Sequence, residues 1–268
     1  MKEIYSYEGY KFEKGSVTKV TDPLTVESPL QISINGESFT VVMQTPGAEK
    51  ELATGLLYAE KVIKDFDLVK WEFTESKYHL IEEVNLVTPT ENLAEGYLSS
   101  RSLLSVSSCG ICGKKEIGDL KPQEGTLHSD IAITPDQIDQ LFDLMHKNQD
   151  IFKVTGGCHA IAAFDEQLNL LALFEDIGRH NALDKVIGQL LMKKQLKKAK
   201  ILAFSGRTSY EMVFKAFRAK IPVIAAVSAP TSFAVDLSKE FGITLLAFCR
   251  NGKSTCYSSP ERIKTELA

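Results

Sequence analysis

The sequence has no long apolar run, no excess of basic residues and no even set of cysteines. No apolar stretch reaches the roughly 18 residues that a membrane span needs, and none follows the charges at the N-terminus, which argues against a signal peptide. The net charge of −4 argues against a nucleic-acid scaffold, because such proteins carry a basic excess. A Walker loop and a Gly-x-Gly-x-x-Gly are both missing, which argues against an NTPase or a dinucleotide dehydrogenase. We therefore expect a cytoplasmic protein with no nucleic-acid or membrane partner.

The composition is that of an ordinary globular protein. Hydrophobic residues make up 44% of the chain, and 17 glycines and 9 prolines are too few for a fibrous repeat or a disordered chain. The 268 residues allow one large domain or two small ones with a sizeable core. Five cysteines without an export signal favour reduced, chemically used thiols over a disulfide framework.

The pattern of apolar residues divides the chain into three parts. Residues 1–97 predict a β-rich region with one helix. Residues 98–130 contain Cys109 and Cys112 among many serines and glycines, which predicts a mobile loop. Residues 131–268 alternate between strand and helix patterns, which predicts parallel crossovers and a layered α/β domain.

Several local signals fix elements within these parts. Asn35-Gly36 marks a hairpin turn, residues 49–63 have helical spacing, and Thr134 with Gln137 predicts a capped helix start. We expect a hairpin over 158–174, strands at 201–205, 221–228 and 244–248, and helices at 181–194, 209–219 and 230–241.

The carboxyl ends of the expected parallel strands are the first candidate site, because ligands bind there in open sheets. Segments 205–209, 228–232 and 248–253 each place small residues or hydroxyls beside backbone amides, and two of them add a positive charge. Thr208 and Glu211 predict a capping box, so that a helix begins directly after an arginine. Helix N-terminal amides beside an arginine attract phosphate oxygens, which predicts an anionic, nucleotide-like ligand.

The second candidate site is a polar cluster, in which six ionisable residues lie between positions 175 and 185. His180 and Asp184 are four residues apart, and on one helical face a carboxylate can hold the imidazole tautomer. The alternative is an exposed helix start with a weak surface ion pair.

Cys109-Gly110-Ile111-Cys112 admits three interpretations. A structural zinc site needs four ligands, and the adjacent Cys158 and His159 are poorly placed to supply the other two. A zinc deaminase would show His-x-Glu followed by Pro-Cys-x-x-Cys, which this chain lacks. Thiol chemistry is the third interpretation, because two following lysines favour a thiolate and a neighbouring thiol can resolve an adduct. Zinc, thiol chemistry and no role at all remain open from the spacing.

Six segments together resemble the formate dehydrogenase accessory sulfurtransferase (FdhD) family and occur in that family's order. They are residues 55–63, 108–113, 155–160, 175–188, 205–211 and 226–231. The Glu-Asp-x-Gly-Arg-His and Cys-Gly-x-Cys-Gly motifs are highly specific in combination, and the resemblance runs from residue 55 to the C-terminus.

The resemblance implies a sulfurtransferase that takes persulfide sulfur from a cysteine desulfurase. It would pass the sulfur to the bis(molybdopterin guanine dinucleotide) form of the molybdenum cofactor, for use by formate dehydrogenase. Cys109 would carry the persulfide and Cys112 would be its partner. The resemblance also implies a larger domain similar to the cytidine deaminase fold, without its zinc and with no metal site of its own.

The expected cofactor-binding residues come from two sources. The resemblance contributes Phe248, Cys249, Arg250, Asn251, Gly252 and Lys253. The strand ends and the polar cluster contribute Ser205, Gly206, Arg207, Arg179 and His180.

Two positions depart from the family pattern. Cys158 stands where threonine or another residue is common, so we assign it no catalytic role. Lys253 stands where arginine is common, and it keeps the charge but not the bidentate fork that binds phosphate. Two alternative functions remain: a cofactor chaperone whose cysteine pair only clamps the metal, and a zinc-stabilised binding module. The sequence leaves open the oligomeric state, a homodimer included, and the identity of the desulfurase.

Overall fold

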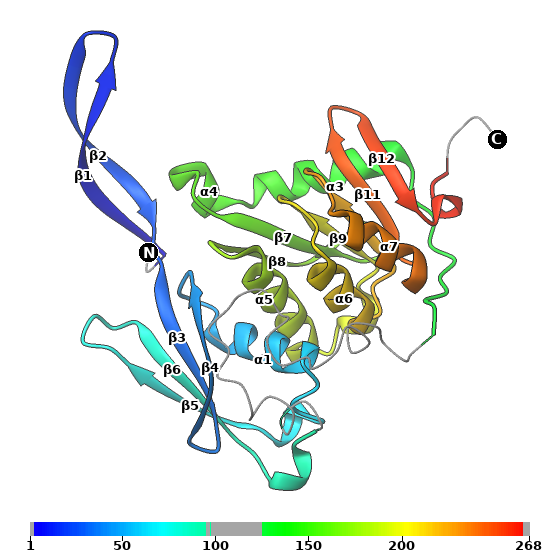
Figure 1. Cartoon of the computed structure of the whole chain (residues 1–268), viewed down its shortest axis with the longest axis horizontal. Coiled ribbons are helices and arrows are strands. Elements are labelled where there is room, and N and C mark those ends of the chain that lie inside the picture. Colours follow the sequence, from blue (N-terminus) through cyan, green and yellow to red (C-terminus); the bar gives the residue numbers. More distant parts are fainter. Residues whose placement is uncertain (1–2, 95–96, 98–124, 265–268) are drawn as a thin grey trace.

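The computed structural model describes residues 3–94, 97 and 125–264, so Cys109 and Cys112 lie outside the described residues. The described strands form a six-stranded sheet, a four-stranded sheet and a separate two-stranded arm (Figure 1). Helices cover the two larger sheets, which confirms the predicted α/β class. No helix of the described residues is long and apolar enough to cross a membrane.

The six-stranded sheet has the order β12-β11-β10-β9-β7-β8. Its three central strands are parallel: β9 (Ile201–Phe204), β10 (Val223–Ala226) and β11 (Thr244–Arg250). The outer strands run antiparallel to their neighbours: β7 (His159–Phe164), β8 (Leu170–Asp176) and β12 (Lys253–Ser258). The predicted hairpin over 158–174 is confirmed as β7 and β8, and the three predicted parallel strands are confirmed as β9 to β11.

Alternate residues of these strands point into two separate cores. On one face, Leu202, Phe204 and Ile224 pack beneath α5 (Arg179–Met192), α6 (Tyr210–Arg218) and α7 (Ser232–Phe241). On the other face, Ile201, Ala203 and Val223 pack against α3 (Pro135–Lys147). The sheet is therefore the middle of three layers, which explains why its central strands are apolar on both faces.

The four-stranded sheet has the order β4-β3-β6-β5 and packs on α1 (Glu49–Ala59). Its strands are β3 (Ser28–Ile34), β4 (Glu37–Gln44), β5 (Lys70–Glu75) and β6 (Ile81–Val87). Asn35 and Gly36 join β3 to β4 with φ of 52° and 80°, which confirms the predicted tight turn.

Two glycines allow α1 to lie directly against α5. A Cβ added to Gly55 would fall 1.9 Å from the carbonyl oxygen of Asp184, and one added to Gly188 would fall 1.9 Å from that of Glu51. The two backbones are thus in contact, and no larger residue fits at either position. This contact joins the helix of the four-stranded sheet to the helical layer of the six-stranded one (Figure 1).

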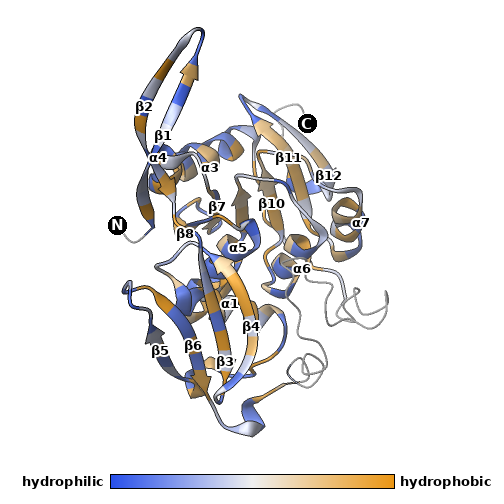
Figure 2. Ribbon diagram, turned by 60° about the vertical axis from the view of Figure 1, so that its left-hand side comes forward, coloured by the Kyte–Doolittle hydropathy of each residue, from blue (hydrophilic) through white to orange (hydrophobic). Residues whose placement is uncertain are grey.

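The two-stranded arm consists of β1 (Ile4–Glu13) and β2 (Ser16–Thr25). It projects away from both sheets, and its ribbon carries hydrophobic and hydrophilic residues along its whole length (Figure 2).

Shorter elements complete the described chain. They are α4 (Asp150–Thr155) and the 3-10 turns Phe66–Leu68, Thr90–Asn92, Leu196–Lys198 and Pro260–Arg262. The helix predicted over 49–63 ends at Ala59, because the chain turns at Lys61, where φ is 52°. Strand β12 and the arm strand β1 were not predicted, although Asn251-Gly252 before β12 is the same turn signal as Asn35-Gly36.

Candidate functional site

One edge of the six-stranded sheet gathers most of the predicted site. Strands β9, β10 and β11 end at this edge, and because β7 and β8 run antiparallel, His159 and Asp176 pair there as well. A pocket of about 880 Å³ opens at the same edge. Its walls come from the strand ends, α3 and the segment from Gln149 to His159.

Four of the predicted cofactor-binding residues line this pocket: Ser205, Cys249, Arg250 and Asn251. Arg179, His180, Gly206 and Arg207 lie at the same edge but not in the pocket wall. The remaining three, Phe248 near the end of β11, Gly252 in the turn and Lys253 at the start of β12, are exposed.

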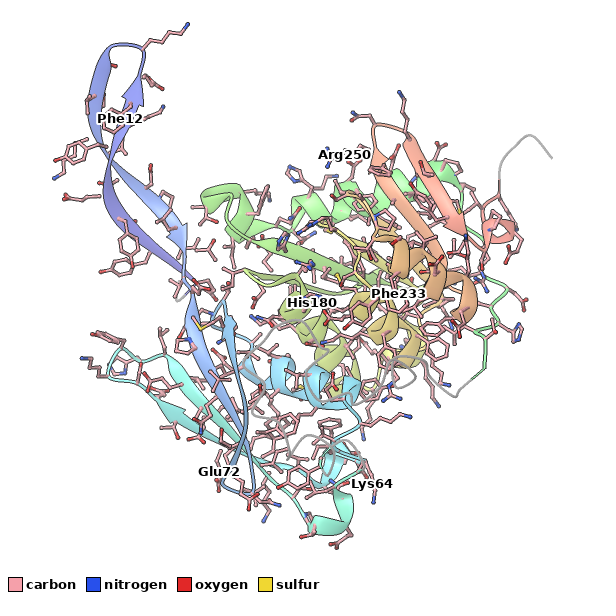
Figure 3. The ribbon with its side chains drawn as sticks, in the orientation of Figure 1. Phe12, Lys64, Glu72, His180, Phe233 and Arg250 are labelled. Carbon is pink, nitrogen blue, oxygen red and sulfur yellow. The ribbon has the colours of Figure 1, made fainter. Side chains whose placement is uncertain are left out.

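The segment 248–253 forms a tight hairpin turn between β11 and β12. Arg250 pairs with Lys253 across a turn in which Asn251 and Gly252 have φ of 52° and 72°. Arg250 Nε donates a hydrogen bond to the carbonyl of Val227, which ties the hairpin to the end of β10. Figure 3 shows Arg250 on β11 at this end of the sheet.

The predicted pairing of His180 with Asp184 is wrong. His180 Nε2 lies 2.7 Å from Glu211 Oε2 and 3.1 Å from Ser209 Oγ, both at the start of α6. Asp184 lies one turn further along α5 and is buried, where its carboxylate accepts hydrogen bonds from Lys215 Nζ. Both contacts join α5 to α6. The partner of His180 is therefore a residue of the neighbouring helix and not Asp184 of its own helix.

The predicted capping box of Thr208 and Glu211 is also wrong. Helix α6 begins one residue later, with Ser209 at the N-cap and no side-chain capping bond. The backbone of Thr208 instead bridges to the loop after β10, through the carbonyl of Ala229 and the amide of Thr231. This bridge holds Thr208 outside the helix and leaves Glu211 to contact His180.

Two hydrogen-bonding groups at this edge are buried and have no partner among the described residues: Arg179 Nε and Thr208 Oγ1. Thr208 is fully buried, and such groups are normally satisfied by protein, water or ligand. These two groups and the uncapped backbone amides at the start of α6 can donate hydrogen bonds to a bound anion.

The positive groups at this edge lie close enough to affect one another. Burial lowers the pKa of His159, and the charges of Arg179 and Arg207 lower it further. Burial and the charge of Arg207 likewise lower the pKa of Arg179. A ligand with negative charge would relieve this repulsion, which supports the predicted anion site.

The two cysteines in the pocket wall are protonated thiols. Cys158 Sγ lies 3.3 Å from Glu175 Oε1, and burial and this carboxylate raise the pKa of the thiol. Burial raises the pKa of Cys249 to about 12. Neither thiol is a nucleophile at neutral pH, because the reactive species is the thiolate.

Sequence reasoning missed the wall that α3 contributes. Asp139, Phe142, Asp143 and His146 line the pocket and are spaced as one face of a helix. The sequence signal that could have indicated this wall is the polar face of the capped helix α3, which carries one aromatic residue. Among the described residues, no group of three or more His, Cys, Asp or Glu could hold a metal ion.

The comparisons with known proteins agree with these observations. The model of the FdhD/NarQ family matches residues 25–264. A protein of Picrophilus torridus named sulfur carrier protein FdhD is 40% identical over 91% of this chain and 93% of its own length. A protein of the same name from Sulfolobus acidocaldarius is 36% identical over 94% of this chain and 96% of its own length. Another from Streptomyces coelicolor is 35% identical over 96% of this chain and 95% of its own length.

A crystal structure of a protein from Desulfotalea psychrophila has the same fold. It superposes with a TM-score of 0.78 at 21% identity and covers 98% of this chain and 100% of its own. At that identity the likeness concerns the fold alone, whereas the family match and the curated relatives extend over nearly the whole sequence. The chain therefore belongs to the FdhD/NarQ family.

Proposed function

We propose that this protein is a sulfur carrier for formate dehydrogenase, acting on the molybdenum cofactor as its substrate. The observation that carries the proposal is the sheet edge where Arg179 and Thr208 have buried groups without partners beside a large pocket. Several curated relatives are named sulfur carrier proteins, which supports the sulfur-transfer part.

The cofactor, as bis(molybdopterin guanine dinucleotide), would bind along this edge through its phosphates and its polar rings. Arg179, Arg207 and the amides at the start of α6 would hold phosphate oxygens. The pocket, with Ser205, Cys249, Arg250 and Asn251 in its wall, would take a ring system of the cofactor. Glu211 would keep the His180 imidazole oriented toward this ligand.

The sulfur steps would belong to Cys109 and Cys112. The Cys109 thiolate attacks the outer sulfur of a desulfurase persulfide, the donor's S–S bond breaks, and the donor cysteine leaves as a thiolate. Cys112 then attacks the inner sulfur of the Cys109 persulfide, which forms a disulfide and releases the outer sulfur as sulfide to the cofactor's metal. A dithiol reductant returns the pair to its thiol state.

The thiols in the pocket wall are unsuited to this chemistry. Cys158 and Cys249 are buried and protonated, so a sulfur bound there would need a thiolate that the surroundings disfavour. Burial also raises the pKa of Cys256, the fifth cysteine. The proposed carrier is therefore the Cys109-x-x-Cys112 pair, and the strand edge is the proposed place of delivery.

The test is the intact mass of the protein after incubation with a cysteine desulfurase and cysteine. We expect one added sulfur that a reductant removes, and none on the Cys109→Ala variant. Guanosine diphosphate, as a soluble fragment of the cofactor, should bind both proteins equally.

Two results would overturn the proposal. No added sulfur on reduced protein would favour the cofactor chaperone, in which the cysteine pair only clamps metal. Stoichiometric zinc that thiol-modifying reagents release would favour the zinc-stabilised module.

A further inference from the structure

A buried cluster of three polar residues adjoins the turn that carries Arg179 and His180. Its centre is Asp176, the last residue of β8, whose side chain is fully buried. Lys185 on α5 is also buried, and its Nζ lies 2.6 Å from Asp176 Oδ2. Thr45, the residue after β4, is the third member and is buried as well. These three residues are the Asp176 cluster.

Thr45 joins the four-stranded sheet to this turn through all of its polar groups. Its amide donates a hydrogen bond to Asp176 Oδ2, and its carbonyl accepts one from Lys185 Nζ at 2.5 Å. Its hydroxyl oxygen accepts a third from the amide of Ile177 at 3.1 Å. The chain that leaves β4 is therefore bonded to the turn between β8 and α5 (Figure 1).

The second carboxylate oxygen of Asp176 holds the start of α5. Asp176 Oδ1 accepts hydrogen bonds from the amide of Gly178 at 2.8 Å and from Asn181 Nδ2 at 3.0 Å. Gly178 is the N-cap residue of α5, and a Cβ added to it would fall 2.9 Å from Asn181 Nδ2. The carboxylate thus fixes the backbone on both sides of the first two residues of α5, which are candidate ligands of the anion.

Stability alone does not explain a buried ion pair at this place. Removing two charges from water costs about as much as their attraction returns, and an apolar pair of similar size often gives a fold of equal stability. A fully bonded pair does fix one arrangement of the chain around it, because another arrangement would leave a buried charge without a partner. In this protein the fixed arrangement is that of the turn between β8 and α5.

The cations at this edge need such a constraint. Burial, Arg179 and Arg207 together lower the pKa of His159, so these groups lie close enough to repel one another when protonated. The carboxylate of Asp176 acts in the opposite direction on the same imidazole. Repulsion favours backbone conformations that separate the cations, and a site that keeps them together before the anion binds requires a rigid backbone.

We propose that Thr45, Asp176 and Lys185 are positioning residues of the anion site, and that they hold Arg179 and His180 in the conformation that binds phosphate oxygens. None of the three lies in the pocket wall, so they act through the turn. The inference rests on the proposed function, because it requires that an anion binds at this edge. It also gives the four-stranded sheet a part in ligand binding, through Thr45.

Thr45→Val is the variant that tests the cluster. Valine has nearly the shape of threonine but lacks the oxygen that accepts from Ile177. Lys185→Met is less suitable, because it leaves the Asp176 carboxylate buried without its cation. In Thr45→Val we expect the dissociation constant of pyrophosphate to rise about tenfold, because the amide of Ile177 loses its acceptor and the turn shifts.

The same variant should change the NMR signal of a residue that Thr45 does not contact. The imidazole resonances of His180 should shift in ligand-free Thr45→Val, whereas those of the exposed His128 should not. Thr45→Ser keeps the hydroxyl oxygen, so it should restore both the His180 resonances and the pyrophosphate affinity. Calorimetric titration and NMR, both well below the thermal midpoint, measure the two quantities.

Thr54→Val is the matched control. Thr54 is fully buried in α1, and its Oγ1 donates to the carbonyl of Lys50 within the same helix. This variant also removes a buried hydroxyl, and it should lower the thermal midpoint without changing pyrophosphate binding or the His180 resonances.

The possible results separate the inference from the proposed function. Normal pyrophosphate affinity and unshifted His180 resonances in Thr45→Val would overturn the inference alone. Equal losses in Thr45→Val and Thr54→Val would also overturn it, because the effect would then be one of general stability. A wild-type protein that does not bind pyrophosphate would refute the anion site itself, and the inference with it.

Discussion

His180 Nε2 and Glu211 Oε2 lie 2.7 Å apart between the first turns of α5 and α6, and the two side chains are only 16% and 10% exposed. Ser209 Oγ lies 3.1 Å from the same imidazole nitrogen. The two partners come from helices that follow β8 and β9, so this contact fixes the relative position of two strand ends in the candidate site.

Glu211→Gln should weaken the binding of guanosine diphosphate about tenfold, because it removes a charged partner of a nearly buried imidazole. The shape of the side chain is kept, so the thermal midpoint should change little. Calorimetric titration measures the dissociation constant. Glu166→Gln, at an exposed position, is the matched control, and equal affinity in both variants would show that Glu211 does not orient the site.

Cys109→Ala should abolish persulfide formation and formate dehydrogenase activity in cells, whereas Cys158→Ala should leave both close to wild type. The reason is that Cys158 is a buried thiol whose pKa is raised by burial and by Glu175. Mass spectrometry and an activity assay in a complemented deletion strain measure the two readouts. Loss of the persulfide in the Cys158 variant, with normal protein levels, would contradict the assignment.

The stability of the protein should fall as the pH drops below the ordinary histidine pKa of 6.5, in part because of His159. Burial and two arginines lower the pKa of His159, so the unfolded chain binds a proton at a pH where the folded protein does not. The loss therefore begins near pH 6.5 and ends at the lower, folded pKa. Urea unfolding at several pH values should show a smaller loss in His159→Gln.

Pyrophosphate should raise the pKa of His159 if an anion binds at this edge, because it would neutralise part of the arginine charge. Titration of the imidazole resonances by NMR, with and without pyrophosphate, measures this directly. An unchanged titration of His159 at saturating pyrophosphate would contradict the anion site.

Lys215→Met should destabilise the protein by about 3–5 kcal/mol, because it leaves the buried carboxylate of Asp184 without its partner. The side chains of Asp184 and Lys215 are 2% and 13% exposed. Lys194→Met removes a cation from an ion pair with Asp67 that is largely exposed, and it should have little effect. Denaturant unfolding compares the two, and similar losses would show that burial does not set the strength of the pair.

Gly55→Ala should destabilise the protein by about 1–3 kcal/mol or more, because the new methyl would overlap the backbone of α5. The Cβ would lie 1.9 Å from the Asp184 carbonyl oxygen, so the helices must separate. Gly125→Ala is the control, because a Cβ there meets nothing within 4 Å. Thermal unfolding of both variants gives the comparison.

Much of the fold follows from signals that act over a few residues. Asn35-Gly36 forms the predicted turn because both residues accept positive φ, and Thr134 with Gln137 forms the predicted capping box because both reach backbone amides three residues apart. The alternation of apolar runs with helical spacing determined the α/β class. The Glu-Asp-x-Gly-Arg-His and Cys-x-x-Cys motifs determined the family, which the comparisons confirm.

The partners of the buried polar groups were decided by tertiary structure alone. The spacing in the sequence predicted a contact between His180 and Asp184. The packing of α5 on α6 instead brings Glu211 to the imidazole of His180, and it brings Lys215 to Asp184. The α3 wall of the pocket and the contact of Gly55 with α5 also join residues that are far apart in sequence. The local sequence determines the turns and helix caps because those interactions form between residues a few positions apart. The site depends on how the layers of the fold pack together, and a local sequence pattern does not determine contacts between residues that are far apart in the chain.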